Sequence, residues 1–223
     1  MKRLDIIVEG QSEREFISQL VAPYLEECGV IESYYVSPIV IRSNPNNRGG
    51  MTKYSHLKDE ILKSLSSSNP DLVVSTLIDF FRLPSHFPHP ENLQSLSSDE
   101  IKAQEIQKCM SADINDSRFI PYIQLHEFEA FMFASCDGFR YCYGDSDKRT
   151  SSLYRIISEF DNPEKINSSP EGAPSKRILS IIQEYDKVGD GNIILLQNGM
   201  EVILEKCPRF RDWIEQLIQR CRE

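Results

Sequence analysis

Two carboxylates, Glu9 and Glu13, lie on either side of a glycine turn near the start of the chain. They follow residues 4–8, a short apolar run rich in β-branched side chains that predicts a buried strand. Ser12, with Glu15 three positions later, forms a capping-box pattern and predicts a helix start. Glu9 would then stand at the carboxyl end of a buried parallel strand, where open α/β sheets bind their ligands. The simpler alternative is that Glu9 is a solvated loop residue and that Glu13 only complements the helix dipole.

A second apolar segment repeats this arrangement. Residues 71–78 (DLVVSTLI) form the clearest buried strand of the sequence and lead directly into Asp79. Because the carboxyl ends of parallel strands share one edge of a sheet, we expect Asp79 and Glu9 to lie within reach of one cation. Aspartate is also common as a turn cap, and this alternative remains open for Asp79.

A third acidic group follows residues 119–125 (FIPYIQL), which predict another strand. The chain continues through His126, Glu127 and Glu129. In a helical phase Glu127 lies on a different face from His126 and Glu129. We therefore expect one or two of these three side chains to point toward the site.

Carboxylates without a cysteine or histidine ligand set favour a hard cation. His126-Glu127 lacks the second histidine of a HExxH zinc site, and the six cysteines show no CxxC spacing. Mg²⁺ or Mn²⁺ held by such acids is suited to phosphodiester cleavage. The residues therefore predict Mg²⁺ or Mn²⁺ as cofactor, with Glu9, Glu13, Asp79 and Glu127 as ligands and Glu129 and His126 as further candidates.

Two basic side chains, Lys176 and Arg177, stand at the start of a predicted helix within residues 168–178 (SSPEGAPSKRI). Cations at that end oppose the helix dipole, so an acid cluster or an anion nearby would explain them. Lys176 is our candidate for stabilising the negative charge that develops during phosphoryl chemistry. A solvated helix start is the alternative.

The elements that must position these residues alternate between strands and amphipathic helices. This order predicts an α/β fold of Rossmann-like type, with a central, mostly parallel sheet flanked by helices. Helical periodicity over residues 12–28 is interrupted by Pro23, which should kink that helix. We expect a single domain over residues 1–223, with a core at about 1–135 and a helical C-terminal part at about 150–223 packed on it. Residues 42–50 form a turn-rich, locally basic loop that could contact a nucleic-acid backbone.

The composition limits the classes of partner. The formal charge of −9 and the pI of about 5.1 count against a stand-alone module that binds nucleic acid by phosphate neutralisation. Any contact with nucleic acid would then need local basic clusters, a bound cation or a second subunit. No apolar run is long enough to span a membrane, and the chain start does not resemble a signal peptide. Scattered cysteines indicate reduced thiols, so we expect a cytoplasmic protein.

Four blocks of the sequence resemble one family. VEG-x-SE after the first strand, LID at the end of residues 71–79, RFIPYIQLHEFEA and APSKRI are similar to the family known as domain of unknown function 4276. That family is regarded as similar to the Toprim fold of topoisomerases, primases and the OLD-type nucleases. The resemblance implies that Glu9 matches the Toprim glutamate and that Asp79 matches the first acid of its DxD motif. Phe81 replaces the second acid, so Glu13, Glu127 or Glu129 would have to supply the missing ligand.

The resemblance implies a Mg²⁺-dependent Toprim-type nuclease, acting on DNA rather than RNA. It also implies a bacterial defence setting with an ATPase partner, and an oligomer is possible. Glu9 and Lys176 would be the catalytic residues, the latter matching a later lysine of the OLD-like enzymes. Two alternatives remain open: a non-catalytic Toprim-like subunit that binds an ATPase, which Phe81 and the acidic charge favour, and a phosphohydrolase of small nucleotides.

Overall fold

A parallel β-sheet forms the centre of the molecule. The computed structural model describes residues 2–39, 51, 53–81, 83–166 and 172–223, so the basic loop expected at 42–50 lies outside the described residues. The strand order is β2-β1-β3-β4, with β5 also pairing with β3, and every pairing is parallel. The strands are β1 (Lys2–Val8), β2 (Ile31–Pro38), β3 (Leu72–Asp79), β4 (Phe119–Ile120) and β5 (Ile123–Gln124). The predicted α/β class with a parallel sheet flanked by helices and a helical C-terminal part is confirmed.

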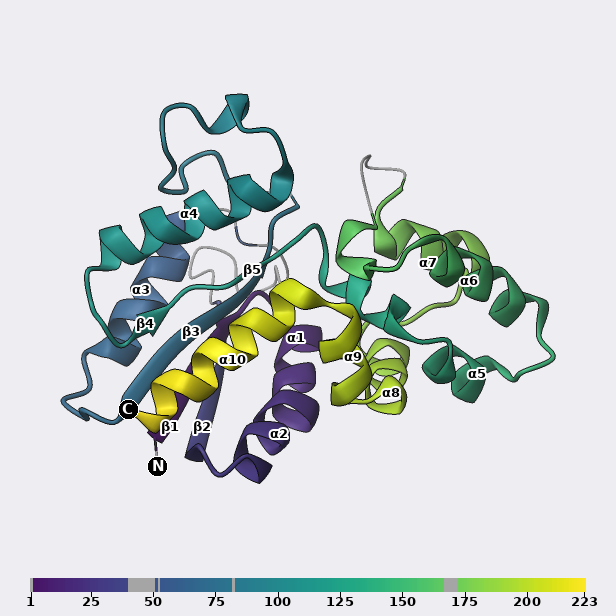
Figure 1. Ribbon diagram of the computed structural model, residues 1–223, viewed down its shortest axis with the longest axis horizontal. Coiled ribbons are helices and arrows are strands. Elements are labelled where there is room, and N and C mark those ends of the chain that lie inside the picture. Colours follow the sequence, from purple (N-terminus) through teal and green to yellow (C-terminus); the bar gives the residue numbers. More distant parts are fainter. Residues whose placement is uncertain (1, 40–50, 52, 82, 167–171) are drawn as a thin grey trace.

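Helices cover both faces of this sheet (Figure 1). Successive strand residues point to opposite faces of the sheet. Ile6 therefore packs in one core with α1 (Gln11–Phe16), α2 (Ala22–Glu27) and α10 (Pro208–Arg222), whereas its neighbour Ile7 packs in another with α3 (Tyr54–Leu65) and α4 (Asp99–Ile114). This double coverage explains why β1 and β3 are near-continuous apolar runs rather than alternating ones. The helices of the first part of the chain are α1 (Gln11–Phe16), α2 (Ala22–Glu27), α3 (Tyr54–Leu65) and α4 (Asp99–Ile114), with a 3-10 turn, η2 (Leu93–Ser95), before α4.

The first helix departs from its predicted start and course. It begins at Gln11 with Gly10 as its N-cap, and no side chain caps it, so the capping box predicted for Ser12 is wrong. Ser12 is instead buried in the first turn. Pro23 is expected to kink this helix. In the structure a π-helical turn, η1 (Ile17–Val21), comes directly before α2 and accommodates the proline. Such a turn lets the helix continue past a residue that has no N–H to donate.

The strand predicted at 119–125 is divided in two. Pro121 has no N–H for the ladder, and at this point Thr76 of β3 takes over the pairing with its side chain. The Thr76 hydroxyl donates to the Tyr122 carbonyl and accepts from the Tyr122 N–H, both at 2.9 Å. The chain is thereby re-aimed so that β5 carries it to the carboxyl edge of β3, beside Asp79.

The C-terminal part is helical, and it returns to the sheet through α10. Glu164 is fully buried and accepts hydrogen bonds from the N–H groups of Arg209 and Phe210, which the first turn of α10 cannot satisfy internally. Trp213 of α10 stacks on Tyr122, with ring centroids 4.6 Å apart. This part comprises η3 (Phe128–Ala134), α5 (Asp137–Tyr143), α6 (Lys148–Glu159), η4 (Pro163–Lys165), α7 (Pro174–Ile181), α8 (Gly189–Asn198), α9 (Met200–Lys206) and α10 (Pro208–Arg222). Among the described residues, no helix is long and apolar enough to cross a membrane.

Candidate functional site

Glu9 and Asp79 are brought together by the pairing of β1 with β3. The two strands run in parallel register, with Val8 opposite Leu77, so the residues that follow them reach the same edge of the sheet. Glu9 Oε1 accepts a hydrogen bond from the Asp79 N–H at 2.9 Å. The expected juxtaposition of these two acids at the carboxyl edge is therefore present in the structure.

Glu13 and Glu129 extend this acidic group from two further elements. Glu13 lies in the first turn of α1 and is 4% exposed, while Glu129 lies in η3 and is 3% exposed. Gly10 makes room for this arrangement, since a Cβ at that position would lie 3.3 Å from Glu13 Oε2. We call Glu9, Glu13, Asp79 and Glu129 the carboxylate cluster.

Among the described residues, the cation paired with this cluster is Lys187, which the sequence analysis did not select. Its Nζ lies 3.2 Å from Glu13 Oε1 and 3.3 Å from Glu129 Oε1. It also lies 5.7 Å from the centre of the Phe128 ring, within range of a cation–π interaction. Lys187 lies directly before α8, between Asp186 and the Gly189-Asp190-Gly191 run that opens this helix. Such a run is a turn signal, but it does not indicate which acids the lysine meets.

Burial and mutual repulsion perturb the ionisation of the carboxylate cluster. Burial raises the pKa of Glu9 to about 7, the Asp79 N–H bond works against this rise, and the charge of Glu13 adds to it. Burial and the charge of Glu9 raise the pKa of Asp79 well above its usual value. Burial also raises the pKa of Glu129, although Lys187 opposes this effect. For Lys187 itself, burial lowers the pKa, but the attraction of Glu13, Glu129 and Asp79 outweighs it and raises the pKa.

Glu127 and His126 are turned toward other partners. Glu127 Oε2 accepts a hydrogen bond from the Ser175 N–H at 3.0 Å, so this carboxylate meets the first turn of α7. Its charge still contributes to the raised pKa of Glu129. His126 is buried with a backbone φ of 66°, and burial lowers its pKa. Its carbonyl accepts from the N–H of Phe81 at 2.9 Å.

Lys176 and Arg177 make no ion pair with the carboxylate cluster among the described contacts. Lys176 is exposed in the first turn of α7. The Nε of Arg177 donates to the Gly172 carbonyl at 2.8 Å, and its guanidinium lies 5.4 Å from the centre of the Phe160 ring. The structure therefore places Lys187, rather than either of these side chains, against the acids.

The donor chemistry of the carboxylate cluster fits a hard cation such as Mg²⁺ or Mn²⁺, because all four side chains offer carboxylate oxygens. Within the part of the chain that the structure describes, however, no group of three or more acidic, histidine or cysteine side chains is arranged so that it could hold a metal ion. The ammonium of Lys187 engages Glu13 and Glu129 instead. Metal binding by all four acids would therefore require the Lys187 ammonium to release Glu13 and Glu129.

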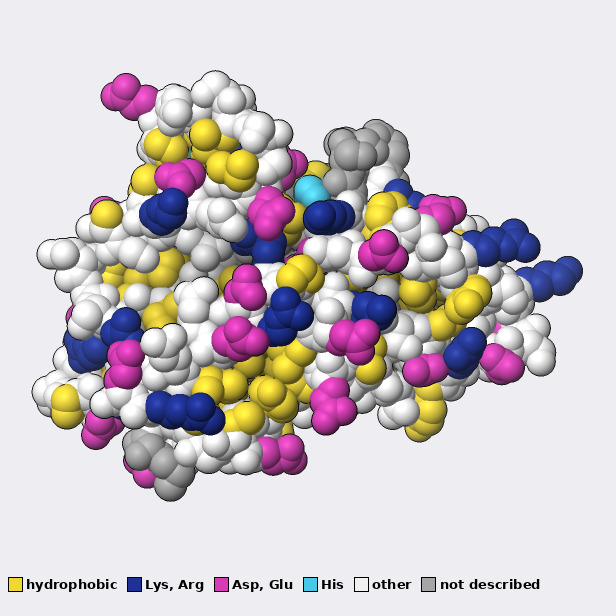
Figure 2. Space-filling view, viewed as in Figure 1, with side chains coloured by type: hydrophobic (Ala, Val, Ile, Leu, Met, Phe, Trp, Pro, Cys, Tyr) yellow, Lys and Arg dark blue, Asp and Glu magenta, His cyan; other side chains and the backbone are white. Residues whose placement is uncertain are grey.

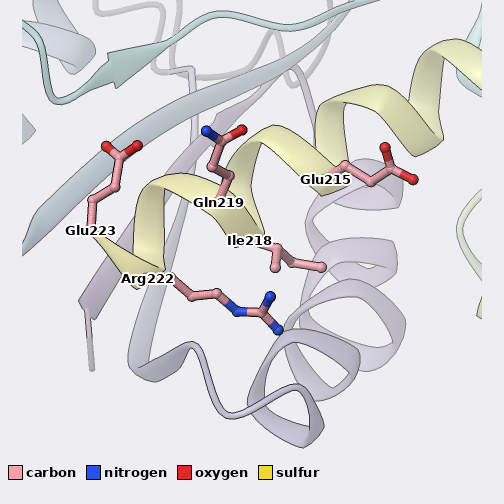
Figure 3. A pocket seen from close by; sticks show the side chains of 5 residues that line it. All are labelled: Glu215, Ile218, Gln219, Arg222 and Glu223. Atoms are coloured by element: carbon pink, nitrogen blue, oxygen red, sulfur yellow. The ribbon is translucent and has the colours of Figure 1, made fainter.

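A surface groove lies away from the carboxylate cluster, along the last turns of α10 (Figure 3). It has a volume of about 460 Å³, and no member of the carboxylate cluster lines it. On the face shown in Figure 2, acidic and basic side chains are interspersed rather than gathered into a single basic track. Neither feature resembles a preformed groove for a nucleic-acid backbone.

The family comparison covers nearly the whole chain. The model of the family described as "Domain of unknown function (DUF4276)" matches residues 8–218. The chain therefore belongs to this family, as its sequence blocks predicted. The comparison with curated proteins gives no match.

Two solved structures are similar to the chain over most of its length. One is the C-terminal region of the Xanthomonas campestris pv. campestris OLD protein, with 16% identity and a TM-score of 0.49, covering 100% of this chain and 95% of that one. The other is the C-terminal region of the Burkholderia pseudomallei OLD protein, with 14% identity and a TM-score of 0.46, covering 98% of this chain and 96% of that one. Both similarities are distant.

Proposed function

We propose that this protein is a Mg²⁺- or Mn²⁺-dependent nuclease of the Toprim type that cleaves phosphodiester bonds in DNA. One observation carries the proposal: four carboxylates from two strand ends, a helix and a 3-10 turn lie together at the carboxyl edge of a parallel sheet, and Lys187 pairs with two of them. Open α/β sheets bind their ligands at this edge. Perturbed pKa values of half-buried acids, such as those of Glu9 and Asp79, are typical of functional sites.

The carboxylate cluster would hold the metal, which when bound supplies charge neutralisation at the scissile phosphate and an activated water. The chain itself would hold the metal-binding carboxylates in position and exclude water from them. Glu9 is fixed by the Asp79 N–H, and Glu13 and Glu129 are almost fully buried. A lysine would stabilise the charge that develops on the phosphate. Two lysines are candidates for this role: Lys187, which reaches the cluster from its solvent-exposed side, and Lys176, which the sequence analysis selected.

The experiment is a cleavage assay on supercoiled plasmid, single-stranded DNA, RNA and a mononucleotide, each with Mg²⁺, Mn²⁺ or EDTA. Cation-dependent cleavage that Glu9→Ala and Asp79→Ala both abolish supports the proposal. Glu215→Ala, which changes an exposed acid of α10, should leave cleavage unaltered. Cleavage that survives Glu9→Ala would refute the assignment of the site. Comparing Lys187→Met with Lys176→Met then decides which lysine serves the reaction.

A second function is favoured by two observations at the same site. Phe81 stands where the Toprim pattern has its second acid, and Lys187 already neutralises part of the carboxylate cluster. Both suit a non-catalytic subunit that binds an ATPase partner. Absence of cleavage on every substrate, together with stable co-purification of an ATPase, would favour this function over the nuclease.

A further inference from the structure

Lys187 occupies the space between two carboxylates that a bound cation would share. Its Nζ lies 3.2 Å and 3.3 Å from oxygens of Glu13 and Glu129, which come from different elements of the fold. Both acids are almost fully buried, whereas the Lys187 side chain is 41% exposed. The lysine therefore enters the cluster from the solvent side and retains a path back to water.

The backbone that carries Lys187 is held on both sides of it. The Asp186 N–H donates to Asp190 Oδ2 at 3.1 Å, and the Gly189 N–H donates to Asp186 Oδ2 at 3.1 Å. Asp190 Oδ2 also accepts from the Tyr143 hydroxyl at 3.1 Å. Because these bonds fix the loop, the side chain of Lys187 can leave the carboxylates by rotating its own methylene chain while the loop stays in place.

We propose that Lys187 is a resident counter-ion that competes with a divalent cation for Glu13 and Glu129. This inference rests on the proposed metal-dependent function and adds an order of events to it: the ammonium withdraws to solvent as the cation binds. An ammonium and a divalent cation repel each other, so they cannot both contact the same two oxygens.

The test is a titration with Mn²⁺ alone, followed through the electron paramagnetic resonance signal of the free ion. Lys187→Met removes the competing charge and should bind Mn²⁺ about tenfold more tightly than the wild type, the gain expected from removing two partly exposed ion pairs. Lys187→Arg should bind Mn²⁺ no more tightly than the wild type, since a guanidinium holds carboxylates through paired hydrogen bonds. Lys206→Met is the matched control, with 45% exposure and one surface ion pair, and should leave the affinity unchanged.

The proposal would be overturned if Lys187→Met bound Mn²⁺ with the same affinity as the wild type or more weakly. It would also be overturned if Lys187→Arg bound Mn²⁺ more tightly than the wild type. If the proposal alone fails, Mn²⁺ still binds the wild type and Glu9→Ala still abolishes that binding. If neither the wild type nor Lys187→Met binds Mn²⁺, the metal-dependent function fails as well. The melting temperature measured in EDTA shows whether each variant is folded. Mn²⁺ should raise the melting temperature of Lys187→Met more than that of the wild type.

Discussion

Replacing Glu9 by glutamine should make the protein more stable at pH 8. The glutamine keeps an oxygen that can accept the hydrogen bond from the Asp79 N–H, so the geometry of the strand ends is preserved. What it removes is a negative charge that lies close to Asp79 and Glu13 on a half-buried side chain. The variant therefore isolates the energetic cost of ionising Glu9 in the folded protein.

The magnitude follows from the pKa of Glu9, which is about 7 in the folded protein against 4.5 ordinarily. Between these pH values the folded state holds the proton more tightly than the unfolded state, so the free energy of unfolding falls as the pH rises from 4.5 to 7 and is level above that. One pKa unit corresponds to about 1.4 kcal/mol, which makes the full loss about 3 kcal/mol. Screening by water at the partly exposed Glu9 reduces it to about 2 kcal/mol. Glu9→Gln has no ionisable group at this position, so its free energy of unfolding should not show this loss.

The assay is urea unfolding in EDTA from pH 4.5 to pH 8, followed by the fluorescence of Trp213, the single tryptophan of the chain. The wild type and Glu9→Gln should have the same free energy of unfolding near pH 4.5. The advantage of the variant over the wild type should then grow steadily up to pH 7. Glu215→Gln, at an exposed position of α10, should reproduce the wild-type profile. A Glu9→Gln profile parallel to that of the wild type, or a variant less stable than the wild type at pH 8, would refute the reasoning.

Three further substitutions test the packing that positions the site, each by chemical denaturation followed by circular dichroism. Glu164→Ala should cost about 3 kcal/mol, because it leaves two buried N–H groups of α10 without an acceptor; a loss below 1 kcal/mol would contradict this role. Gly138→Ala should cost about 2 kcal/mol or more, since its Cβ would lie 2.2 Å from the Ile194 carbonyl oxygen and would force α5 away from α8; an unchanged midpoint would show that the helices can separate freely. Trp213→Phe should cost about 1–2 kcal/mol through loss of the indole bond to the Ser75 hydroxyl, and a neutral result would show that this bond contributes nothing.

The strands that carry the acids could be predicted from the sequence because they are buried on both faces. β1 and β3 are each a near-continuous apolar run rather than an alternating one, the pattern typical of strands in a parallel sheet covered on both faces. The ends of the first helix could not be predicted in this way. The capping-box pattern at Ser12 is local, and the burial of that side chain under tertiary contacts overrides it. The division of the strand at Pro121 likewise depends on Thr76, which is distant in sequence.

The acids of the carboxylate cluster share a sequence signal, namely their position after an apolar strand, and Lys187 has no such signal. It lies in a loop that is brought to the sheet edge by the packing of η3 and α8, so its partners are defined only in three dimensions. Lys176 attracted attention because a cation at a helix start needs an explanation. In the structure Glu127 binds the N–H of the neighbouring Ser175, so an acid does meet that helix start, while the Lys176 side chain stays exposed.

The energetics of the carboxylate cluster argue for a ligand rather than for a structural role. Among the described residues only the ammonium of Lys187 pairs with these acids, and it cannot by itself neutralise four carboxylates. Desolvation and the remaining repulsion raise the pKa values of Glu9, Asp79 and Glu129. Glutamine at position 9 would keep the one hydrogen bond that Glu9 makes with the backbone of Asp79 without that cost. Acids that destabilise the fold where a neutral residue would serve are typical of functional sites, since stability is given up there for binding or chemistry. A divalent cation added to such a cluster should therefore stabilise the protein most at the pH where the acids are ionised, which places the largest Mn²⁺-induced rise in melting temperature above pH 7 rather than below it.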